Sequence, residues 1–424
     1  MRSHPLLRRL SSNGIRLGLD RVAAFLDHLG APHRGYPILQ IAGTNGKGSV
    51  TAFSEAIFRA QGLRVGATTS PHIQQVNERV RINGTPISDP DLDALVNEVY
   101  QRAKAWGELE GSSPLEGEPL TYFEAMVAVS FLHFSRQEVD VALVEVGLGG
   151  RLDATSAAAA SVSAITSVGL DHCDRLGDNL ASIAAEKAGI VRPGAPVVVG
   201  ALPDEAMGVV RSMAVARESP MLCRGIGYEY GGNEGAMWWS HDGVRIDGLR
   251  PSLHGPHQLG NAAVALTAVA QLGRVHSSLR VTNEAMREGL SKAFHPGRLE
   301  WVADKVLVDG AHNVEAATAL ANYLSKAEVE RPVTLLLGAS ADKSVRSIAA
   351  ILAPWVDTIY TTHCSHPRAM RAGDVAAQLS GVTQRVVPAG EVEVALPAAR
   401  ESGNLVLVAG SLFLAGAVRE LCGR

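Results

Sequence analysis

Short apolar runs alternate with longer helical patterns along most of the chain. Runs that are apolar at nearly every position and are separated by helices are typical of strands buried on both faces of a parallel sheet. In the first part of the chain, this pattern predicts strands at Tyr36–Ala42, Arg64–Thr69, Val139–Val146, Val162–Val168 and Pro196–Gly200. Helices are predicted at Ser49–Arg59, Leu180–Ile190 and Leu259–Leu272. The first part is therefore expected to be an α/β domain.

A second series of strands and helices follows Phe294–Gly297, where proline and glycine interrupt the pattern. Its strands are predicted at Lys305–Asp309, Pro332–Ala339, Thr358–Thr362, Arg385–Ala389 and Asn404–Ser411. Such alternation predicts a smaller doubly wound α/β domain of roughly 130 residues. We expect two domains, 1–293 and 294–424. Within the first, Tyr228–Gly248 is expected to form a small β-hairpin and Gly107–Pro119 a loop.

Composition narrows the class of protein. The 424 residues include 39 Lys and Arg against 43 Asp and Glu, a net charge of −4, which disfavours nucleic acid and anionic membranes as partners. There is no signal-peptide pattern at the N-terminus and no apolar run of about 18 residues. The 4 cysteines are widely spaced and form no CxxC pair. We expect a cytoplasmic, monomeric protein that acts on small molecules.

A glycine-rich loop connects the first predicted strand to the first predicted helix. It consists of Gly43, Thr44, Asn45, Gly46, Lys47, Gly48 and Ser49. Glycines allow backbone N–H groups to converge on an anion at the positive end of a helix. Lys47 would reach the β- and γ-phosphates of a nucleotide, and the Ser49 hydroxyl would join a Mg²⁺ shell. The alternative is an ordinary strand–helix turn. In the usual phosphate loop the hydroxyl residue directly follows the lysine, whereas here Gly48 intervenes.

This loop and several other motifs resemble those of folylpolyglutamate and dihydrofolate synthases, a branch of the Mur-ligase-like ATP-dependent amide ligases. The matching segments, in order, are Ala42–Ser49, Ser70–His72, Asn77–Arg79, Glu145–Thr155, Gly169–His172, Glu186–Ile190, His257–Gln258 with Asn261, Pro296–Arg298, Asp309–Asn313 and Gly410–Leu412. The resemblance as a whole extends from about Leu17 to Arg419. The resemblance implies a parallel-sheet ATPase domain with the phosphate loop, then a smaller glutamate-binding domain, with the active site in the cleft between them.

Three polar side chains near predicted strand ends form a candidate metal site. Ser70, Glu145 and His172 would converge there, and hard oxygen ligands suit Mg²⁺ or Mn²⁺. The alternative is a Glu145–Arg151 ion pair and a helix-capping His172. The resemblance implies that the three side chains, with Ser49 and the nucleotide phosphates, hold Mg²⁺, and that Mn²⁺ or K⁺ are further candidates.

Lys187 lies in an otherwise apolar helix, where a charged amine is costly unless it is paired or neutralised. A salt bridge to a nearby acid is one interpretation. The resemblance implies another, in which the amine is carbamylated and, as an anion, supports the metal site.

Four further residues are candidates for nucleotide or amino-acid contacts. The resemblance implies that Asn261 contacts adenine, although a residue that opens a helix is also a common N-cap. Arg298, just past the domain boundary, would stabilise charge on the γ-phosphate when the cleft closes. Asp309 would bind nucleotide and His312 would position the incoming amino acid. Without the resemblance, Asp309 and His312 are equally well interpreted as turn residues.

The resemblance also implies a substrate site for the pterin. The positions that match it are Gly14, Ile15, Arg16, Thr121, Tyr122, Phe123, Glu124, Leu152, Asp153 and Ala154, and Ser411 is added from the second domain. Phe123 offers a stacking face but is equally a core residue. The cluster His363–Arg368 is interpreted as a loop over the cleft rather than as a zinc site. Val76, Val314 and Phe413 stand where the family usually has Phe, Pro and Tyr.

The expected activity is ATP-dependent addition of L-glutamate to a folate-type substrate, either a tetrahydrofolate polyglutamate or dihydropteroate, through an acyl phosphate. Three alternatives are a Mur enzyme acting on a peptidoglycan precursor, a regulatory P-loop NTPase, and a dinucleotide-binding module. The last is disfavoured because no G-x-G-x-x-G follows the first strand. The sequence leaves the base that deprotonates glutamate unidentified.

Overall fold

The computed structural model describes residues 5–11, 16, 18–107, 120–327, 329, 331–382, 385–401 and 404–424. The candidate residues Gly14 and Ile15 lie outside the described residues. So does the predicted loop at Gly107–Pro119, apart from Gly107. The chain divides into two compact units, Met1–Ser252 with Leu259–Phe294, and Leu253–Gln258 with His295–Arg424. No helix in the described part combines the length and apolar character needed to cross a membrane.

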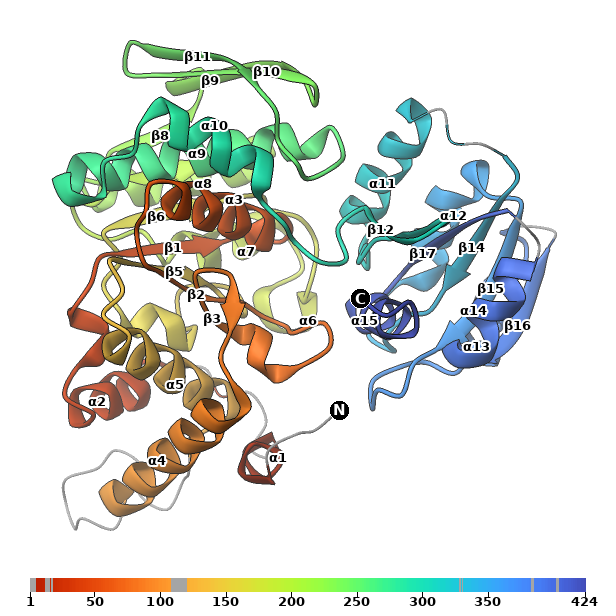
Figure 1. Ribbon diagram of the computed structural model, residues 1–424, viewed down its shortest axis with the longest axis horizontal. Helices are drawn as coiled ribbons and strands as arrows, with labels where there is room; N and C mark the ends of the chain where they lie inside the picture. The colour runs from red at the N-terminus through yellow and green to blue at the C-terminus, as the bar shows by residue number, and fades with distance from the viewer. Residues whose placement is uncertain are drawn as a thin grey trace. The chain divides into compact units, whose positions relative to one another are not determined.

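One sheet organises the described part of the first unit (Figure 1), with the strand order β11-β10-β9-β8-β7-β6-β1-β5-β2-β3-β4. Its strands are β1 Ile38–Ala42, β2 Val65–Thr68, β3 Val80–Ile82, β4 Thr85–Pro86, β5 Val141–Glu145, β6 Val162–Ile165, β7 Val197–Val199, β8 Met221–Arg224, β9 Gly227–Asn233, β10 Ala236–His241 and β11 Val244–Leu249. Strands β7, β6, β1, β5 and β2 pair in parallel. The five strands predicted in this part of the chain are confirmed, because each is a short run buried on both faces.

The predicted β-hairpin at Tyr228–Gly248 is confirmed as antiparallel structure, but the segment has one strand more than a single hairpin. Three antiparallel strands, β9, β10 and β11, occupy this segment, and β9 pairs with β8, so that they continue the main sheet. The turn at Asp242-Gly243 has positive φ at both residues, as a two-residue hairpin turn requires. A second turn, between Asn233 and Ala236, is closed by the Asn233 side chain, which accepts hydrogen bonds from the N–H groups of Gly235 and Ala236.

Helices cover both faces of this sheet. They are α1 Pro5–Ser11, α2 Asp20–His28, α3 Lys47–Ala60, α4 Asp89–Gly107, α5 Tyr122–Arg136, α6 Cys173–Leu176, α7 Leu180–Ala188, α8 Asp204–Ala216, α9 His257–Val275 and α10 Asn283–Lys292, with 3₁₀ turns at Pro32–Arg34, Val76–Arg79, Ala154–Ala157 and Ser277–Leu279. Helices α3, α9 and α10 lie on one face and α5 with α4 on the other (Figure 1). Helices α7 and α8 pack on β6 and β7 through Ile183, Val210 and their neighbours.

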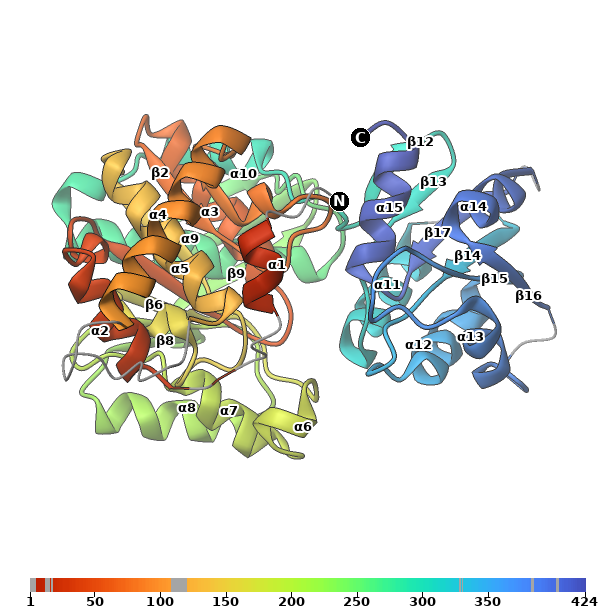
Figure 2. The same ribbon diagram turned by 90° about the horizontal axis from the view of Figure 1, so that it is seen from below.

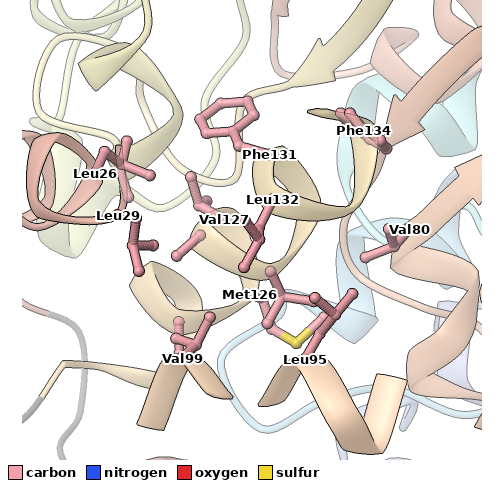
Figure 3. Close-up of a cluster of buried hydrophobic side chains, with 14 of the residues drawn as sticks. Leu26, Leu29, Val80, Leu95, Val99, Met126, Val127, Phe131, Leu132 and Phe134 are labelled. Carbon is pink, nitrogen blue, oxygen red and sulfur yellow. The ribbon is translucent and has the colours of Figure 1, made fainter. Parts of the chain in front are cut away.

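A large apolar cluster fixes α5 against the sheet and against α4 (Figure 3). Phe131 and Phe134 of α5 are fully buried, and Leu95 and Val99 of α4 are nearly so. Burying side chains of this size contributes about 1.5–3 kcal/mol each. The cluster therefore holds the start of α5, which carries several candidate substrate residues, in a fixed place.

The second unit contains a smaller sheet in its described residues, with the order β12-β13-β17-β14-β15-β16. Its strands are β12 Glu300–Ala303, β13 Val306–Val308, β14 Val333–Leu337, β15 Thr358–His363, β16 Val386–Glu391 and β17 Leu405–Ala409. Its helices are α11 Val314–Lys326, α12 Val345–Leu352, α13 Ala372–Gln378, α14 Val392–Glu401 and α15 Leu412–Leu421, with a 3₁₀ turn at Ala353–Trp355. The five predicted strands are confirmed. The sequence missed β12, so Asp309 follows the second strand of this unit, not the first.

The strands of this sheet pack their two faces on different helices, as Figure 2 shows. Leu307 and Leu407 contact the cluster formed with α11, α12 and α13. Their neighbours Val306, Val308 and Val406 contact α14 and α15. Because successive side chains of a strand point to opposite faces, a continuous apolar run is required when both faces are covered.

Candidate active site

The candidate residues of the first unit follow four neighbouring parallel strands. The phosphate loop follows β1, Ser70 follows β2, Glu145 is the last residue of β5, and His172 lies beyond β6. The order β6-β1-β5-β2 places these strand ends at one edge of the sheet. Open α/β sheets bind their ligands at this edge.

The phosphate loop is held by Thr166, Ser167 and Gly169, which follow β6 and for which the sequence predicted no such role. Thr44 N–H donates to the Ser167 carbonyl at 2.9 Å, and Thr44 Oγ1 accepts from Gly169 N–H at 3.0 Å. The Thr166 hydroxyl donates to the Asn45 carbonyl at 2.5 Å, and the Ser167 hydroxyl to the same carbonyl at 2.9 Å. These bonds restrict the loop before any ligand arrives.

Gly43 has to be glycine at the base of this loop. A Cβ there would lie 1.9 Å from Thr166 Oγ1, in a backbone conformation with φ +155°. We expect Gly43→Ala to weaken ADP binding by about tenfold and to cost about 1–3 kcal/mol of stability, as overpacking does. Titration calorimetry and thermal melts would measure both.

Gly208→Ala is the matched control, because a Cβ at Gly208 in α8 meets nothing within 4 Å. It is expected to bind ADP normally and to gain about 0.5–1 kcal/mol in stability. Normal ADP binding by Gly43→Ala would contradict the assigned loop geometry.

Lys47 is the first residue of α3, and its Nζ donates to the Gly43 carbonyl at 2.8 Å and to the Thr44 carbonyl at 3.3 Å. Asn261 lies on the other side of the loop, and a Cβ on Gly46 would be 2.6 Å from its Oδ1. The N-cap interpretation of Asn261 is wrong, because α9 already begins at His257. The Asn261 amide instead lies against the phosphate loop at Gly46.

The metal candidates share this edge of the sheet. Glu145 and Ser49 are buried, and Ser70 is half-buried beside a cis peptide bond to Pro71. His172 occupies the N-cap position of α6 without a capping side-chain hydrogen bond, and Arg151 pairs with Glu186 at 2.7 Å rather than with Glu145. Among the described residues, no group of three or more His, Cys, Asp and Glu is arranged to hold a metal. The donors of the proposed site are one carboxylate, two hydroxyls and one imidazole, and the oxygens fit a cation such as Mg²⁺, which keeps waters and binds phosphates.

Arg79 belongs to the same region, although no role was predicted for it. Its guanidinium lies over the Tyr122 ring, 5.3 Å from the centroid, and its Nε donates to His72 Nδ1 at 2.9 Å. Burial lowers the pKa of Arg79, while Tyr122, Glu145 and Glu78 oppose the shift. The Arg79 charge is therefore near enough to the Glu145 carboxylate to be attracted by it.

Lys187 is buried, with 4% of its surface exposed, and its side-chain amine makes no hydrogen bond or ion pair within the described part of the chain. Its pKa is lowered to about 7 by burial and by the charge of Lys47, against the opposing effect of Asp171. The salt-bridge interpretation of Lys187 is therefore wrong. The structure brings its amine close to the phosphate loop and leaves a large fraction of it neutral near pH 7.

Asp153 organises the loop after β5. Its carboxylate accepts from Leu148 N–H at 2.8 Å, from Thr155 N–H at 3.0 Å and from the Thr155 hydroxyl at 2.6 Å, and burial raises its pKa. Phe123 packs over the same loop, where a Cβ on Gly147 would be 2.4 Å from its ring. Ala154 is buried and Leu152 is half-buried beside Asp153.

Thr121 and Glu124 form the capping box that begins α5. Glu124 Oε2 accepts from Thr121 N–H at 2.8 Å, and its Oε1 accepts from Arg21 at 2.5 Å. Both carboxylate oxygens are thus engaged inside the protein, which gives Glu124 a structural role. Tyr122, between them, faces Arg79, and Arg16 is half-buried.

In the second unit, Arg298 and Asp309 lie close together. Asp309 is buried and accepts hydrogen bonds from Leu299 N–H at 2.9 Å and Ala311 N–H at 2.8 Å. Burial raises the pKa of Asp309, opposed by the Arg298 charge. Leu299 has a positive φ of 45°, so Asp309 holds a strained backbone that carries Arg298.

His312 and Ser411 follow neighbouring strands β13 and β17, whose ends are joined by a hydrogen bond of 2.7 Å from Gly410 N–H to the Ala311 carbonyl. The Ser411 hydroxyl caps α15 by accepting from Phe413 N–H at 3.2 Å. His366, from the loop after β15, stacks on Phe413 with 3.7 Å between ring centroids.

Comparison with protein families finds two matches. Residues 41–269 match the Mur ligase middle domain, and residues 297–412 match the Mur ligase glutamate ligase domain. Among characterised relatives, the dihydrofolate synthase/folylpolyglutamate synthase of Bacillus subtilis is 33% identical over 96% of this chain and 95% of its own length. The enzyme of that name from Mycobacterium tuberculosis is 36% identical over 99% of this chain and 93% of its own length.

Solved structures with the same fold carry relevant ligands. The folylpolyglutamate synthase of Mycobacterium tuberculosis, complexed with ADP and AMPPCP, has a TM-score of 0.90 at 32% identity and covers 99% of this chain and 98% of its own. FolC of Escherichia coli with DHPP and ADP has a TM-score of 0.87 at 31% identity, covering 99% and 98%. A bifunctional folylpolyglutamate synthase/dihydrofolate synthase with Mn, AMPPNP and L-glutamate has a TM-score of 0.86 at 32% identity, covering 99% and 97%.

Proposed function

Because this chain belongs to the folylpolyglutamate synthase/dihydrofolate synthase family of Mur ligases, we propose that it is an ATP-dependent ligase that joins L-glutamate to a folate-type acceptor. The observation that carries this proposal is the phosphate loop at the carboxyl edge of the sheet, with Lys47 at its centre. The names of the relatives favour folate substrates over a peptidoglycan precursor. Both dihydropteroate and tetrahydrofolate polyglutamates are proposed as acceptors, and the enzyme is proposed to act as a monomer.

The chemistry requires activation of a carboxylate. The acceptor carboxylate attacks the γ-phosphorus of ATP, the bond to ADP breaks, and an acyl phosphate forms. The amine of glutamate then attacks the acyl carbon and phosphate leaves. In such reactions the protein acts mainly by positioning and by offsetting negative charge. Lys47 offsets charge on the transferring group, and the converging N–H groups of the loop bind the phosphates.

We propose that Ser49, Ser70, Glu145 and His172 hold Mg²⁺ or Mn²⁺, with K⁺ as a further cation. When bound, the divalent ion neutralises charge on the phosphate oxygens. The neutral fraction of the Lys187 amine favours reaction with CO₂, so we propose that Lys187 carries a carbamate. Arg79 lies near Glu145 and is proposed to bind an anionic part of the substrates.

Asn261 is proposed to contact the adenine, and Asp309 to support the nucleotide site by holding the backbone of Arg298. His312 and Ser411 are proposed to contact the incoming glutamate. Arg16, Tyr122, Phe123, Leu152 and Ala154 remain candidates for the pterin site, to which Thr121, Glu124 and Asp153 contribute by shaping the loops.

Arg298 is proposed to stabilise the transferring phosphoryl group. Arg298→Ala is therefore expected to lower kcat by about 10- to 100-fold, with the Kd for ADP changed by less than about threefold, since the interaction forms only in the transition state. Arg385→Ala, which removes an exposed guanidinium from the same unit, serves as the control. A large change in ADP affinity with an unchanged kcat would contradict the assigned role.

The proposed function is tested by phosphate release with ATP, Mg²⁺ and L-glutamate. Dihydropteroate and tetrahydrofolate are offered separately, and a nucleotide-linked peptidoglycan precursor is the negative control. Release is expected only when glutamate and a folate-type acceptor are both present. Hydrolysis that is independent of both would instead indicate a P-loop NTPase.

A further inference from the structure

Four aromatic side chains of the antiparallel strands face α9. Tyr228 and Tyr230 on β9 pair directly with His241 and Trp239 on β10. Residues opposite one another in an antiparallel pair share a face, as do residues two apart along a strand. The face is identified by a hydrogen bond of 3.0 Å from Trp239 Nε1 to Thr267 Oγ1 of α9.

Three of these four side chains have polar partners within the protein. Besides Trp239, the Tyr228 hydroxyl donates to the Val199 carbonyl at 2.8 Å, and His241 Nε2 lies 2.8 Å from Gln271 Nε2. The Tyr230 hydroxyl is the exception, since it makes no hydrogen bond to any described residue. Tyr230 is half-buried, so its ring is anchored while its hydroxyl stays accessible.

The Tyr230 hydroxyl points to the beginning of α9, beside the phosphate loop. A Cβ on Gly260 would lie 3.1 Å from this hydroxyl. The next residue is Asn261, whose Oδ1 approaches Gly46. Contacts therefore run without interruption from the phosphate loop through Asn261 and Gly260 to Tyr230.

Arg224 fixes the Tyr230 ring from the outside. Its guanidinium lies 4.5 Å from the ring centroid, and its Nη2 donates to the Tyr230 carbonyl at 3.2 Å. Tyr228 stacks on the ring from within the sheet, with 6.4 Å between centroids. A ring held by both neighbours can present its hydroxyl with little loss of entropy on binding.

We propose that the Tyr230 hydroxyl contacts the exocyclic amino group of the adenine base. The inference rests on the proposed function, in which Asn261 contacts the adenine. A phenol hydroxyl accepts a hydrogen bond as well as donating one, and adenine offers an exocyclic amino donor that unsubstituted purine lacks. The strands β9 to β11 thereby contribute a base-contacting residue to the nucleotide site.

The test compares Tyr230→Phe with the wild type by calorimetric titration with ADP and with purine riboside 5′-diphosphate, which carries no group at C6. Loss of one neutral hydrogen bond is expected to weaken ADP binding by about three- to tenfold and to leave binding of the purine riboside diphosphate within about twofold. Tyr228→Phe is the matched control, because it removes a hydroxyl from the same strand. It is expected to lower Tm, through the lost bond to Val199, and to bind ADP normally.

Unchanged ADP affinity in Tyr230→Phe would overturn the inference. An equal loss for ADP and purine riboside diphosphate would also overturn it, because the hydroxyl would then contact the ribose or the phosphates. The proposed function can fail independently of this inference. A wild-type protein that binds ADP but shows no folate-dependent turnover would refute the ligase activity. The two titrations would still decide the role of Tyr230.

Discussion

Replacing Lys47 by alanine is expected to lower kcat/KM for ATP by about 10³-fold, since it removes the cation that offsets charge on the transferring phosphoryl group. The fold should be unaffected, because Lys47 is a half-buried residue at the start of α3 and its Nζ bonds to the carbonyls of its own loop. Phosphate release in the complete assay measures the loss, and a thermal melt checks the fold.

Lys326→Ala provides the control for this variant, because Lys326 is an exposed lysine in the last turn of α11. It should retain wild-type turnover and Tm. Ligase activity retained by Lys47→Ala would show that the Gly43–Ser49 loop is not the phosphate site.

Replacing Lys187 by methionine is expected to change activity and stability in opposite directions. Turnover should fall by about 10²-fold or more, as when a group that supports a metal site is removed. Stability should rise by about 1–3 kcal/mol in CO₂-depleted buffer, because an apolar side chain of similar length replaces a buried amine. Chemical denaturation and the phosphate-release assay measure the two effects.

The stability gain should depend on pH. Burial lowers the pKa of Lys187 from 10.5 to about 7, so between these values the unfolded chain binds more protons than the folded one and the wild type gains stability as pH rises. The advantage of Lys187→Met is therefore largest below pH 7 and shrinks towards pH 10. A pH-independent difference would contradict the lowered pKa.

Lys292→Met, at an exposed position in α10, is the control and should alter neither property. Intact mass under conditions that preserve carbamates tests the modification itself. Wild type should gain the mass of one CO₂ and Lys187→Met should not. The absence of this gain in wild type would refute the carbamate.

The local sequence pattern was sufficient to predict the parallel strands and the phosphate loop. Runs such as Val141–Glu145 are apolar at nearly every position, and this is required of any strand covered on both faces. Gly43 and Gly46 lie between β1 and α3 and adopt positive φ, and Gly48 is in the first turn of α3. Backbone geometry of this kind depends on neighbouring residues, so it can be predicted from the local sequence.

The weaker predictions concerned segments in which tertiary contacts decide the structure. The strands β9 to β11 continue the main sheet because β9 pairs with β8, and β12 forms because it pairs with β13. Both segments are partly exposed, so their apolar patterns are weak. Asn261 was misplaced because α9 begins at His257, two residues before the predicted start at Leu259, so Asn261 lies inside the helix.

The sequence by itself determined two α/β units, their order, and a loop of glycines and one lysine able to bind phosphate. Only the tertiary structure decided that Thr166 and Ser167 hydrogen-bond to that loop from more than 120 residues away, that the Lys187 amine is buried near Lys47, and that the Arg79 charge is attracted by Glu145. The physical reason is that backbone geometry and apolar periodicity act between near neighbours, whereas burial, charge and hydrogen-bond partners depend on which distant strand ends the fold brings to one edge of a sheet.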